Sequence, residues 1–318
     1  MTYNSEDVIE GCLQHCKGMH VVVIDNASSD DTVQKVRLHP SVTLVANETN
    51  RGFAGAVNQG VQQLDYPFIL ILNPDVQILT SISKLVDACS RPGTAAASGR
   101  LIDADGQTQR GFTLRRFPTP AALILEVLGV NRLWPRNPVN RRYRCLDWDL
   151  SLSADIDQPA GAFLLFRREV WELLDGFDTR FHPIWFEDVD FCQRIADLGL
   201  KIRYVPDVVA FHKGGASISR LKWGYRQGYW YASLLRYASK RFRTMEFRGV
   251  SLAIMLGSIP RAIAGGVMRR NGEPLSAYAR VFGLATMCAV RGRLPGRLLE
   301  SGSQEGSRLR KINAKTKS

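Results

Sequence analysis

The chain has 318 residues, of which 45% are hydrophobic and 23% are charged. It can therefore bury a sizeable core and is neither disordered nor collagen-like. Its formal net charge of +12 is unevenly distributed, because residues 201–318 hold 23 Lys and Arg against 5 Asp and Glu. This C-terminal third has a balance of +18, and residues 1–200 have a balance of −6. A basic extension on a mildly acidic body predicts attraction to a polyanion, either an anionic membrane or a nucleic acid.

The six cysteines form no CxxC pair of the kind that builds zinc or redox sites. The first ten residues, MTYNSEDVIE, lack the basic and apolar regions of a signal peptide. We therefore expect buried, reduced thiols and a cytoplasmic protein.

The first 212 residues alternate short apolar runs with helical patterns, which predicts a layered α/β domain. Three of these runs, residues 21–25, 42–46 and 68–72, suit strands that are buried on both faces of a mostly parallel sheet. Between and after them, residues 53–64 and 82–89 carry apolar side chains at helical spacing.

Residues 103–158 are less regular and rich in Arg, Pro and Asn, so we expect a long excursion over the sheet. Periodicity returns with a strand near residues 162–166 and a helix over 187–198 that Gly199 ends. Two further strands are expected at 201–205 and 208–212.

The region after residue 212 differs in kind. Aromatic residues, leucines and arginines alternate at helical spacing over 221–242, and residues 250–268 are apolar. A membrane span over these residues would place Pro260 and Arg261 near its centre, and a central Arg costs roughly 2.5–3.5 kcal/mol on membrane-insertion scales. We therefore expect an interfacial or re-entrant helical pair rather than a span, with basic residues that face lipid headgroups. We expect a catalytic domain over 1–212, a basic helical region over 213–300 and a disordered tail over 301–318.

Two acidic residues follow predicted strands, where ligands bind in open α/β sheets. Asp25 precedes a stretch of helix-capping residues, and capping alone does not explain it. Asp75 follows Asn73-Pro74 and could hold a divalent cation that neutralises a diphosphate. A strand-end Asp is more often a turn former, so Asp75 alone is a weak signal.

The densest group of candidate residues is Glu187-Asp188-Val189-Asp190 at the start of a predicted helix. The helix dipole favours anionic carboxylates there, and an anion of modest pKa is what a general base needs. Simple dipole complementation explains the acids but not Trp185 and Phe186, on which a sugar ring could stack. His212, at the end of the last strand, is by itself more often structural than a ligand.

Taken together, these motifs are more specific than any one of them. They occur in the order Tyr3-Asn4-Ser5, Asp25-Asn26, Asn50-Arg51-Gly52-Phe53-Ala54-Gly55 with Asn58 and Gly60, Leu72-Asn73-Pro74-Asp75, Gly161-Ala162, Gly176-Phe177-Asp178, Phe186-Glu187-Asp188-Val189-Asp190 and His212. This series resembles the family 2 glycosyltransferases, and within them the bacterial rhamnosyltransferase type, over roughly residues 1–242.

The resemblance implies a GT-A fold and the inverting transfer of a sugar from a nucleotide-diphosphate donor. Asp188 matches the general base, with Glu187 orienting the acceptor, and Asp75 with His212 would hold Mg²⁺ or Mn²⁺, because Asn73 replaces the first Asp of the DXD motif. The residues expected to contact the donor nucleotide are Thr2, Tyr3, Asp25, Asn26, Arg51, Asn58 and Asn73. Those expected beside the sugar or acceptor are Gly161, Ala162 and Trp185.

One departure concerns the first residues. The family normally has an apolar strand before the segment that corresponds to Thr2-Tyr3-Asn4, and that strand is missing here. Its loss is expected to expose apolar faces and unpaired backbone groups. A start codon placed too far downstream would explain this. An upstream open frame encoding about six apolar residues supports that hypothesis, and an in-frame stop refutes it.

We expect a protein on the inner face of the plasma membrane that acts on a lipid-linked or cell-envelope glycan, and the resemblance suggests rhamnose as the donor sugar. One alternative is an inactive sugar-nucleotide-binding relative. A nucleic-acid-binding protein is a weaker alternative, because the basic residues alternate with apolar runs and no zinc finger, RNP-type motif or helix-turn-helix pattern occurs. No specific nucleic-acid partner is therefore expected.

Overall fold

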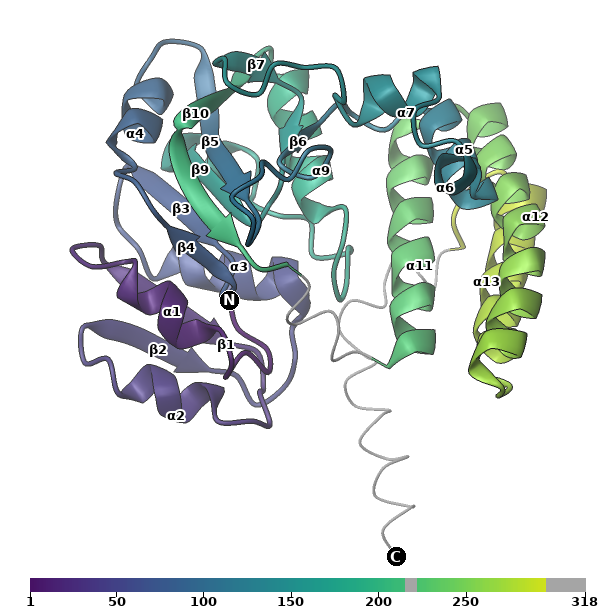
Figure 1. Ribbon diagram of the computed structural model, residues 1–318, viewed down its shortest axis with the longest axis horizontal. Coiled ribbons are helices and arrows are strands. Elements are labelled where there is room, and N and C mark those ends of the chain that lie inside the picture. Colours follow the sequence, from purple (N-terminus) through teal and green to yellow (C-terminus); the bar gives the residue numbers. More distant parts are fainter. Residues whose placement is uncertain (215–221, 296–318) are drawn as a thin grey trace, which may run out of the picture.

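The computed structural model describes residues 1–214 and 222–295, and it places an α/β body beside a layer of long helices (Figure 1). The elements of the first hundred residues are α1 (Ile9–Gln14), β1 (Val21–Asp25), α2 (Thr32–Arg37), β2 (Val42–Ala46), α3 (Gly52–Gln62), β3 (Phe68–Leu72), β4 (Val76–Ile78), α4 (Ser83–Cys89) and β5 (Thr94–Ile102). The predicted strands 21–25, 42–46 and 68–72 are confirmed, as are the helices within 53–64 and 82–89.

The remaining elements complete the body and include α11, α12 and α13, the three long helices that we call the helical layer. They are β6 (Leu114–Arg115), α5 (Pro120–Leu128), α6 (Val130–Leu133), α7 (Pro138–Tyr143), β7 (Ala154–Ile156), β8 (Gln158–Pro159), β9 (Phe163–Arg167), α8 (Arg168–Leu173), α9 (Glu187–Asp197), β10 (Lys201–His212), α11 (Trp223–Arg241), α12 (Thr244–Arg269) and α13 (Glu273–Arg291).

The larger sheet has the strand order β3-β9-β5-β10-β4, and β7 also pairs with β10. Only β5 and β10 run parallel in it, and its other pairs are antiparallel. The strands β1 and β2 form a separate parallel pair. The expected α/β architecture is therefore confirmed, but the larger sheet is mixed rather than mostly parallel.

The two strands expected at 201–205 and 208–212 are one strand, β10. Its register against β5 shifts between Val205 and Val209, the stretch that contains Pro206. Proline has no N–H to donate to the ladder and occurs at such irregularities. The shift therefore lets β10 continue to His212, which lies opposite Val76 of β4.

The prediction of an irregular excursion over 103–158 is wrong in part, because this segment contains α5, α6 and α7. Thr119 caps α5 by accepting a hydrogen bond from the N–H of Ala122, and Pro120 occupies the first turn. The N-cap threonine, the proline after it and the apolar run that follows form a helix-start signal that is visible in the sequence. The buried Leu123 and Val127 of α5 belong to the same apolar core as residues of α12 and α13.

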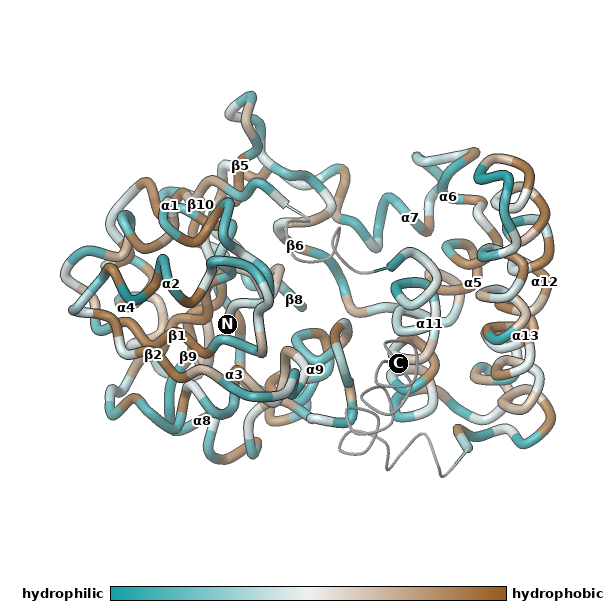
Figure 2. Tube along the Cα trace, turned by 90° about the horizontal axis from the view of Figure 1, so that it is seen from below, coloured by the Kyte–Doolittle hydropathy of each residue, from teal (hydrophilic) through white to brown (hydrophobic). Residues whose placement is uncertain are grey.

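The helical layer shares its core with the α/β body. Phe181 and Phe186, in the segment before α9, belong to the same buried cluster as Tyr231, Leu234 and Tyr237 of α11. In both views α11 lies between α9 and the outer pair of α12 and α13 (Figures 1 and 2). The segment before α9 is therefore held by the helical layer.

The structure corrects the picture of residues 250–268. α12 continues through Pro260 without a break and packs along α13, so residues 250–268 lie in one continuous helix of a helical pair. The guanidinium of Arg261 donates to the carbonyl oxygens of Glu126 and Val127 at the C-terminal end of α5, where a cation is favoured, so Arg261 does not face headgroups. The predicted tail 301–318 lies outside the described residues.

Candidate active site

Three segments that are far apart in sequence meet at Gly161 and Ala162, just before β9. The carbonyl oxygen of Ala162 accepts a hydrogen bond from the N–H of Asn73 at 3.0 Å. The N–H of Gly161 donates to Asp188 Oδ2 at 3.0 Å. The predicted residues after β3, before β9 and at the start of α9 are thus brought together, although the sequence did not show which atoms join them.

Asp188 is held by main-chain donors on both carboxylate oxygens, since the N–H of Val189 donates to Oδ1 at 2.8 Å. Burial raises the pKa of Asp188, while the N–H groups of Val189 and Gly161 and the charge of Arg115 act in the opposite direction. The expectation of a modest pKa is therefore corrected, because desolvation outweighs the donors at the helix start. A raised pKa suits a carboxylate that accepts a proton in catalysis.

Glu187 is buried beside Asp188. Burial, together with the charge of Asp188, raises the pKa of Glu187 well above its ordinary value. Its Oε2 atom has no hydrogen-bond partner among the residues that the structure describes. A neutral carboxylic acid with an unused polar atom can donate a hydrogen bond to a ligand hydroxyl, as can happen where an apolar site keeps an acid protonated.

The segment before α9 has an unusual backbone conformation. Trp185 and Phe186 both lie in the left-handed region, with φ values of 79° and 70°. Bulky side chains rarely adopt this conformation, and such residues concentrate at functional sites where the surrounding structure holds them. The hydroxyl of Ser233 in α11 donates to the carbonyl oxygen of Ile184 at 3.0 Å, which helps to fix this segment.

Asp75 and His212 face each other at the end of the sheet. Both are buried, and His212 Nε2 lies 3.7 Å from Asp75 Oδ1. Gln109 fixes the imidazole, because its Nε2 donates to the carbonyl oxygen of His212 and its Oε1 lies 2.8 Å from His212 Nδ1. Phe112 stacks on the ring with centroids 4.9 Å apart.

The amide of Gln109 determines which imidazole nitrogen carries the proton. Since Gln109 Oε1 can only accept, His212 Nδ1 must donate, which leaves the lone pair of Nε2 directed at Asp75 in the neutral ring. Burial lowers the pKa of His212, with Asp75 acting against it, and this favours the neutral form. An imidazole lone pair and a carboxylate oxygen that face each other without a proton between them form a donor pair for a cation.

The donor set therefore fits a divalent metal such as Mn²⁺ or Mg²⁺ at Asp75 and His212. Among the residues in the described ranges no group of three His, Cys, Asp or Glu side chains forms a ligand cluster. Phosphate oxygens of a bound donor would supply the remaining ligands. The sequence did not single out Gln109 or Phe112, because both lie in the segment expected to be irregular.

Asp25 closes β1 and is almost fully buried. Its Oδ1 accepts from the hydroxyls of Thr2 and Ser28, at 2.9 and 2.5 Å, and its Oδ2 accepts from the N–H of Ser28 at 2.9 Å. A carboxylate has about four acceptor positions, so one on Oδ2 remains for a ligand. Tyr3 follows Thr2 and is half-buried at the same strand end.

Asn26 and Asn58 hold the backbone rather than facing outward. Asn26 is fully buried and bonds to Asn50, to the carbonyl oxygen of Gly52 and to the N–H of Arg51, so it shapes the turn before α3. Both amide atoms of Asn58 bond to the backbone of Phe177 at 2.9 Å. Asn58 is therefore not proposed to contact the donor nucleotide. Arg51, in contrast, is exposed at the start of α3.

Asp190, the third acid of the motif, is structural. It is fully buried and pairs with Arg194 at 2.8 Å and with Lys240 of α11 at 2.7 Å. It thus joins α9 to the helical layer. The spacing of Asp190 and Arg194 is visible in the sequence, but the contact with Lys240 is not.

The sequence profile of glycosyl transferase family 2 matches residues 1–172. An N-acetylglucosaminyl-diphospho-decaprenol L-rhamnosyltransferase of Mycobacterium tuberculosis is 32% identical over 214 residues, which cover 63% of this chain and 68% of that protein. The rhamnosyltransferase WbbL of Escherichia coli is 27% identical over 162 residues, which cover 49% of this chain and 56% of that protein.

Among solved structures, a mannosyltransferase from Pyrobaculum calidifontis in complex with GDP-Man and Mn²⁺ has a similar fold. The TM-score is 0.50 at 18% identity, and the match covers 91% of this chain and 85% of that one. The fold expected from the resemblance, GT-A with a C-terminal helical region, is confirmed. The chain belongs to glycosyl transferase family 2 and is similar to rhamnosyltransferases within it.

Proposed function

We propose that the protein is an inverting, metal-dependent glycosyltransferase that moves a sugar, with rhamnose the first to test, from a nucleotide-diphosphate donor to a lipid-linked or cell-envelope glycan. The observation that carries this proposal is the position of Asp188. Its carboxylate has a raised pKa, and main-chain N–H groups hold it beside Gly161 and Ala162.

In the proposed reaction, Asp188 accepts the proton of the acceptor hydroxyl. The hydroxyl oxygen forms a bond to the anomeric carbon of the donor sugar, and the bond from that carbon to the diphosphate oxygen breaks. The electron pair leaves with the nucleoside diphosphate, so a single displacement inverts the anomeric centre and needs one base. Glu187, whose pKa burial raises well above its ordinary value, would in its protonated form donate a hydrogen bond that orients the acceptor.

Asp75 and His212 would hold Mg²⁺ or Mn²⁺, and the cation would neutralise charge on the departing diphosphate. Gln109 would hold the His212 ring in the orientation and tautomer that direct Nε2 at the cation. On the nucleotide side, Asp25 would accept a hydrogen bond from the base at its remaining position, and Thr2, Tyr3 and Asn26 would shape the pocket. Arg51, exposed at the start of α3, would add positive potential near the phosphates.

The acceptor would enter from the side of the helical layer. A pocket of about 380 Å³ lies beside Trp185, and its walls are Glu126, Trp185, Arg226, Gln227, Trp230, Tyr231 and Arg261. Aromatic faces suit sugar rings, and the guanidinium of Arg226 suits an anionic group such as the diphosphate of a lipid-linked acceptor. Trp185, two residues before Glu187, lines this pocket, so an acceptor bound there would lie beside the segment that leads into Glu187 and Asp188.

The helical layer would also place the enzyme on the membrane. Exposed apolar side chains follow one face of α12 at helical spacing, namely Met245, Leu252, Leu256, Ile259, Ile263 and Val267. Apolar residues run along α12 and α13, at the end of the molecule remote from β1 and β2 (Figure 2). Arg270, Arg280, Arg291 and Arg293 are exposed in the same layer. An apolar face with nearby cations is typical of helices that lie in the interface of anionic membranes.

Thr244–Arg269 is also the one helix in the described ranges that is long and apolar enough to cross a bilayer, and 33% of its most apolar window is buried. By length and composition alone this is weak support for a span. The contacts of Arg261 with α5 favour the interfacial arrangement.

A panel of nucleotide sugars, starting with dTDP-rhamnose, tests the proposal. Donor hydrolysis and transfer are measured with Mn²⁺ or Mg²⁺ and with chelator, first for the parent protein and then for Asp188→Asn. We expect Asp188→Asn to lose transfer by 10²–10⁴-fold while it still binds the nucleotide. Undiminished transfer would refute the assigned base, and nucleotide binding without transfer by the parent would favour an inactive relative.

A further inference from the structure

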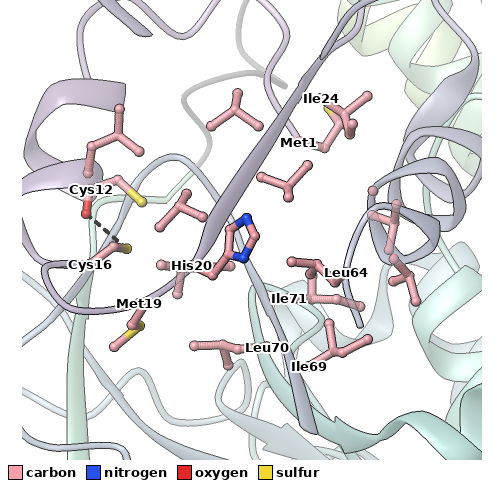
Figure 3. A pocket seen from close by; sticks show the side chains of 18 of the residues that line it. Met1, Cys12, Cys16, Met19, His20, Ile24, Leu64, Ile69, Leu70 and Ile71 are labelled. Carbon is pink, nitrogen blue, oxygen red and sulfur yellow. Dashed lines mark hydrogen bonds between the residues drawn. The ribbon is translucent and has the colours of Figure 1, made fainter. Parts of the chain in front are cut away.

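A cavity of about 390 Å³ between β1 and β3 is lined mainly by apolar side chains, among them Cys12, Leu64 and Ile71 (Figure 3). Of the described residues that line it, none is Asp, Glu, Lys or Arg. A buried phosphate needs cationic or N–H partners, so the diphosphate of a donor has no suitable partner there. The charged groups of the proposed site lie instead at the sheet edge that holds Asp75 and His212.

Two consecutive arginines in β6 have different surroundings. Arg116 stacks on Trp148, with Cζ 4.9 Å from the ring centroid, and its Nη1 pairs with Asp157 at 3.1 Å. Arg115 is half-buried and makes no ion pair with any residue in the described ranges, where its Nε donates to the carbonyl oxygen of Gly111 at 2.6 Å. Since Nε carries only one of the guanidinium N–H groups, both terminal nitrogens of Arg115 remain for a ligand.

The pairing of β6 with β8 places Arg115 beside the segment that holds the proposed base. Arg115 lies opposite Gln158, and β8 leads directly into Gly161, whose N–H donates to Asp188. β8 also contacts α9, the helix that carries Asp188. The positive charge of Arg115 lowers the pKa of Asp188 against the effect of burial, so the two groups are within electrostatic reach. Both oxygens of Asp188 already accept from main-chain donors, and Arg115 is not needed to hold them.

The ring of Phe112 connects the same guanidinium with the proposed metal donors. Arg115 Cζ lies over this ring, 5.9 Å from its centroid. Phe112 also stacks on His212, with centroids 4.9 Å apart and an interplanar angle of 9°. One aromatic ring therefore separates Arg115 from the imidazole that faces Asp75. The guanidinium is near both the proposed base and the proposed cation.

We propose that Arg115 is a further catalytic residue, which binds the donor diphosphate through its terminal N–H groups and stabilises the charge that develops as the diphosphate departs. This inference rests on the proposed function. A guanidinium presents its N–H groups as a planar fork that fits two phosphate oxygens. Phe112 and the carbonyl oxygen of Gly111 hold this fork in place before the ligand binds.

The charge balance of the transfer gives this cation its role. The acceptor oxygen bonds to the anomeric carbon, and the proton of the acceptor hydroxyl goes to Asp188. The electron pair of the broken bond stays on the diphosphate oxygen, so negative charge grows there. A guanidinium that is already oriented stabilises such charge without reorganising during the reaction. Arg115 would share this task with the cation at Asp75 and His212.

Calorimetric titration of the full chain with dTDP, UDP and GDP and with the matching nucleosides, all with Mn²⁺, tests the proposal. We expect Arg115→Gln to weaken binding of the preferred nucleoside diphosphate by roughly 10–100-fold and to leave nucleoside binding unchanged. Arg115→Lys keeps the charge but loses the fork, so its loss should be intermediate. The matched control is the neighbouring Arg116→Gln, which should bind the diphosphate like the parent.

Equal diphosphate affinity in Arg115→Gln and the parent would overturn this inference alone, and a parent that binds none of these nucleotides would overturn the proposed function as well. A loss that is confined to farnesyl diphosphate would assign Arg115 to a phosphorylated acceptor instead of the donor. His212→Ala separates a direct contact from an effect through Phe112. Arg115→Gln combined with His212→Ala should bind the diphosphate more weakly than either single variant. A double variant that binds as well as His212→Ala would make Arg115 a positioning residue for the imidazole and overturn the proposal.

Discussion

The backbone of Gly161 packs directly against the carboxylate of Asp188. The N–H of Gly161 donates to Asp188 Oδ2 at 3.0 Å, and a Cβ atom on Gly161 would lie 2.7 Å from the same oxygen. Any side chain at position 161 would push against the carboxylate rather than against a flexible neighbour. The proposed base is therefore positioned by a main-chain group that only glycine can present at this distance.

Gly161→Ala should displace Asp188 and impair transfer. A misplacement of about 1 Å in a catalytic group can cost 10²-fold, so we expect a loss of about that size in kcat/KM. Nucleotide binding, measured by calorimetry, should change little, because Asp25 and Thr2 are untouched. The matched control is Gly283→Ala on α13, where the added Cβ meets nothing within 4 Å. A Gly161→Ala protein with parental kcat/KM would contradict the positioning role.

The pH profile of transfer should show the raised pKa of Asp188. The base acts only when it is ionised, so kcat/KM should fall as pH decreases through a pKa that lies above the ordinary aspartate value of about 3.9. Arg115 lowers this pKa, so Arg115→Gln should move the acid limb of the profile to higher pH. An acid limb that does not move on this substitution would assign the titration to another group.

The sequence predicts site residues that local patterns mark, but not those whose contacts join segments far apart in the chain. Asp188, Asp75 and His212 each lie at the end of a predicted element, but by themselves Asp75 and His212 were weak signals, and the proposed roles of all three came from the resemblance to the family. Gln109 could not be predicted, since its contacts with His212 join segments 103 residues apart. Asp190 is an intermediate case, because its ion pair with Arg194 four residues later is a local signal, whereas its second partner, Lys240, lies on α11.

The fold shows the same division between local and distant information. Strand positions followed from apolar runs such as residues 68–72, but strand direction did not, because β9 pairs antiparallel with both β3 and β5 through long connections. The helix α5 had a local signal in Thr119 and Pro120. The contact of α5 with α12 had no such local signal, because Arg261 and its acceptor Val127 are 134 residues apart in the sequence.

Glu187→Gln should stabilise the protein at neutral and higher pH. The pKa of Glu187 is raised by burial, so the folded protein keeps a proton that the unfolded chain releases above about pH 4.3. Stability therefore falls as pH rises from that value toward the folded pKa, and a glutamine removes this dependence. Thermal unfolding should show a higher Tm for the variant at pH 8 and a much smaller difference at pH 4. The exposed Glu10→Gln is the control, and parallel Tm curves for Glu187→Gln and the parent would show that no such proton is held.

Gln109→Ala should weaken metal binding without removing a ligand. The loss of a hydrogen bond that orients a metal-binding imidazole typically costs 10–100-fold in affinity, and we expect that range for Mn²⁺ titrated in the presence of the nucleotide. Gln107→Ala, at an exposed position two residues away, is the matched control. If His212→Ala weakens Mn²⁺ binding while Gln109→Ala does not, the imidazole binds the metal without help from Gln109. If neither weakens it, the metal site lies elsewhere.

Substitutions on the outer face of α12 should weaken membrane binding, and substitution of Arg261 should weaken folding. Leu256→Ser combined with Ile263→Ser removes two exposed apolar side chains, each worth about 1.5–3 kcal/mol when fully buried, so binding to anionic vesicles should fall by more than tenfold while Tm changes little. Arg261→Ala should do the reverse, because it leaves the carbonyl oxygens of Glu126 and Val127 without their donor but leaves the outer face intact. Co-sedimentation with vesicles at low and high salt, together with thermal unfolding, measures both effects. Vesicle binding that survives the double substitution would show that α12 does not contact the membrane through this face. Loss of vesicle binding in Arg261→Ala would instead indicate that Arg261 contacts lipid headgroups.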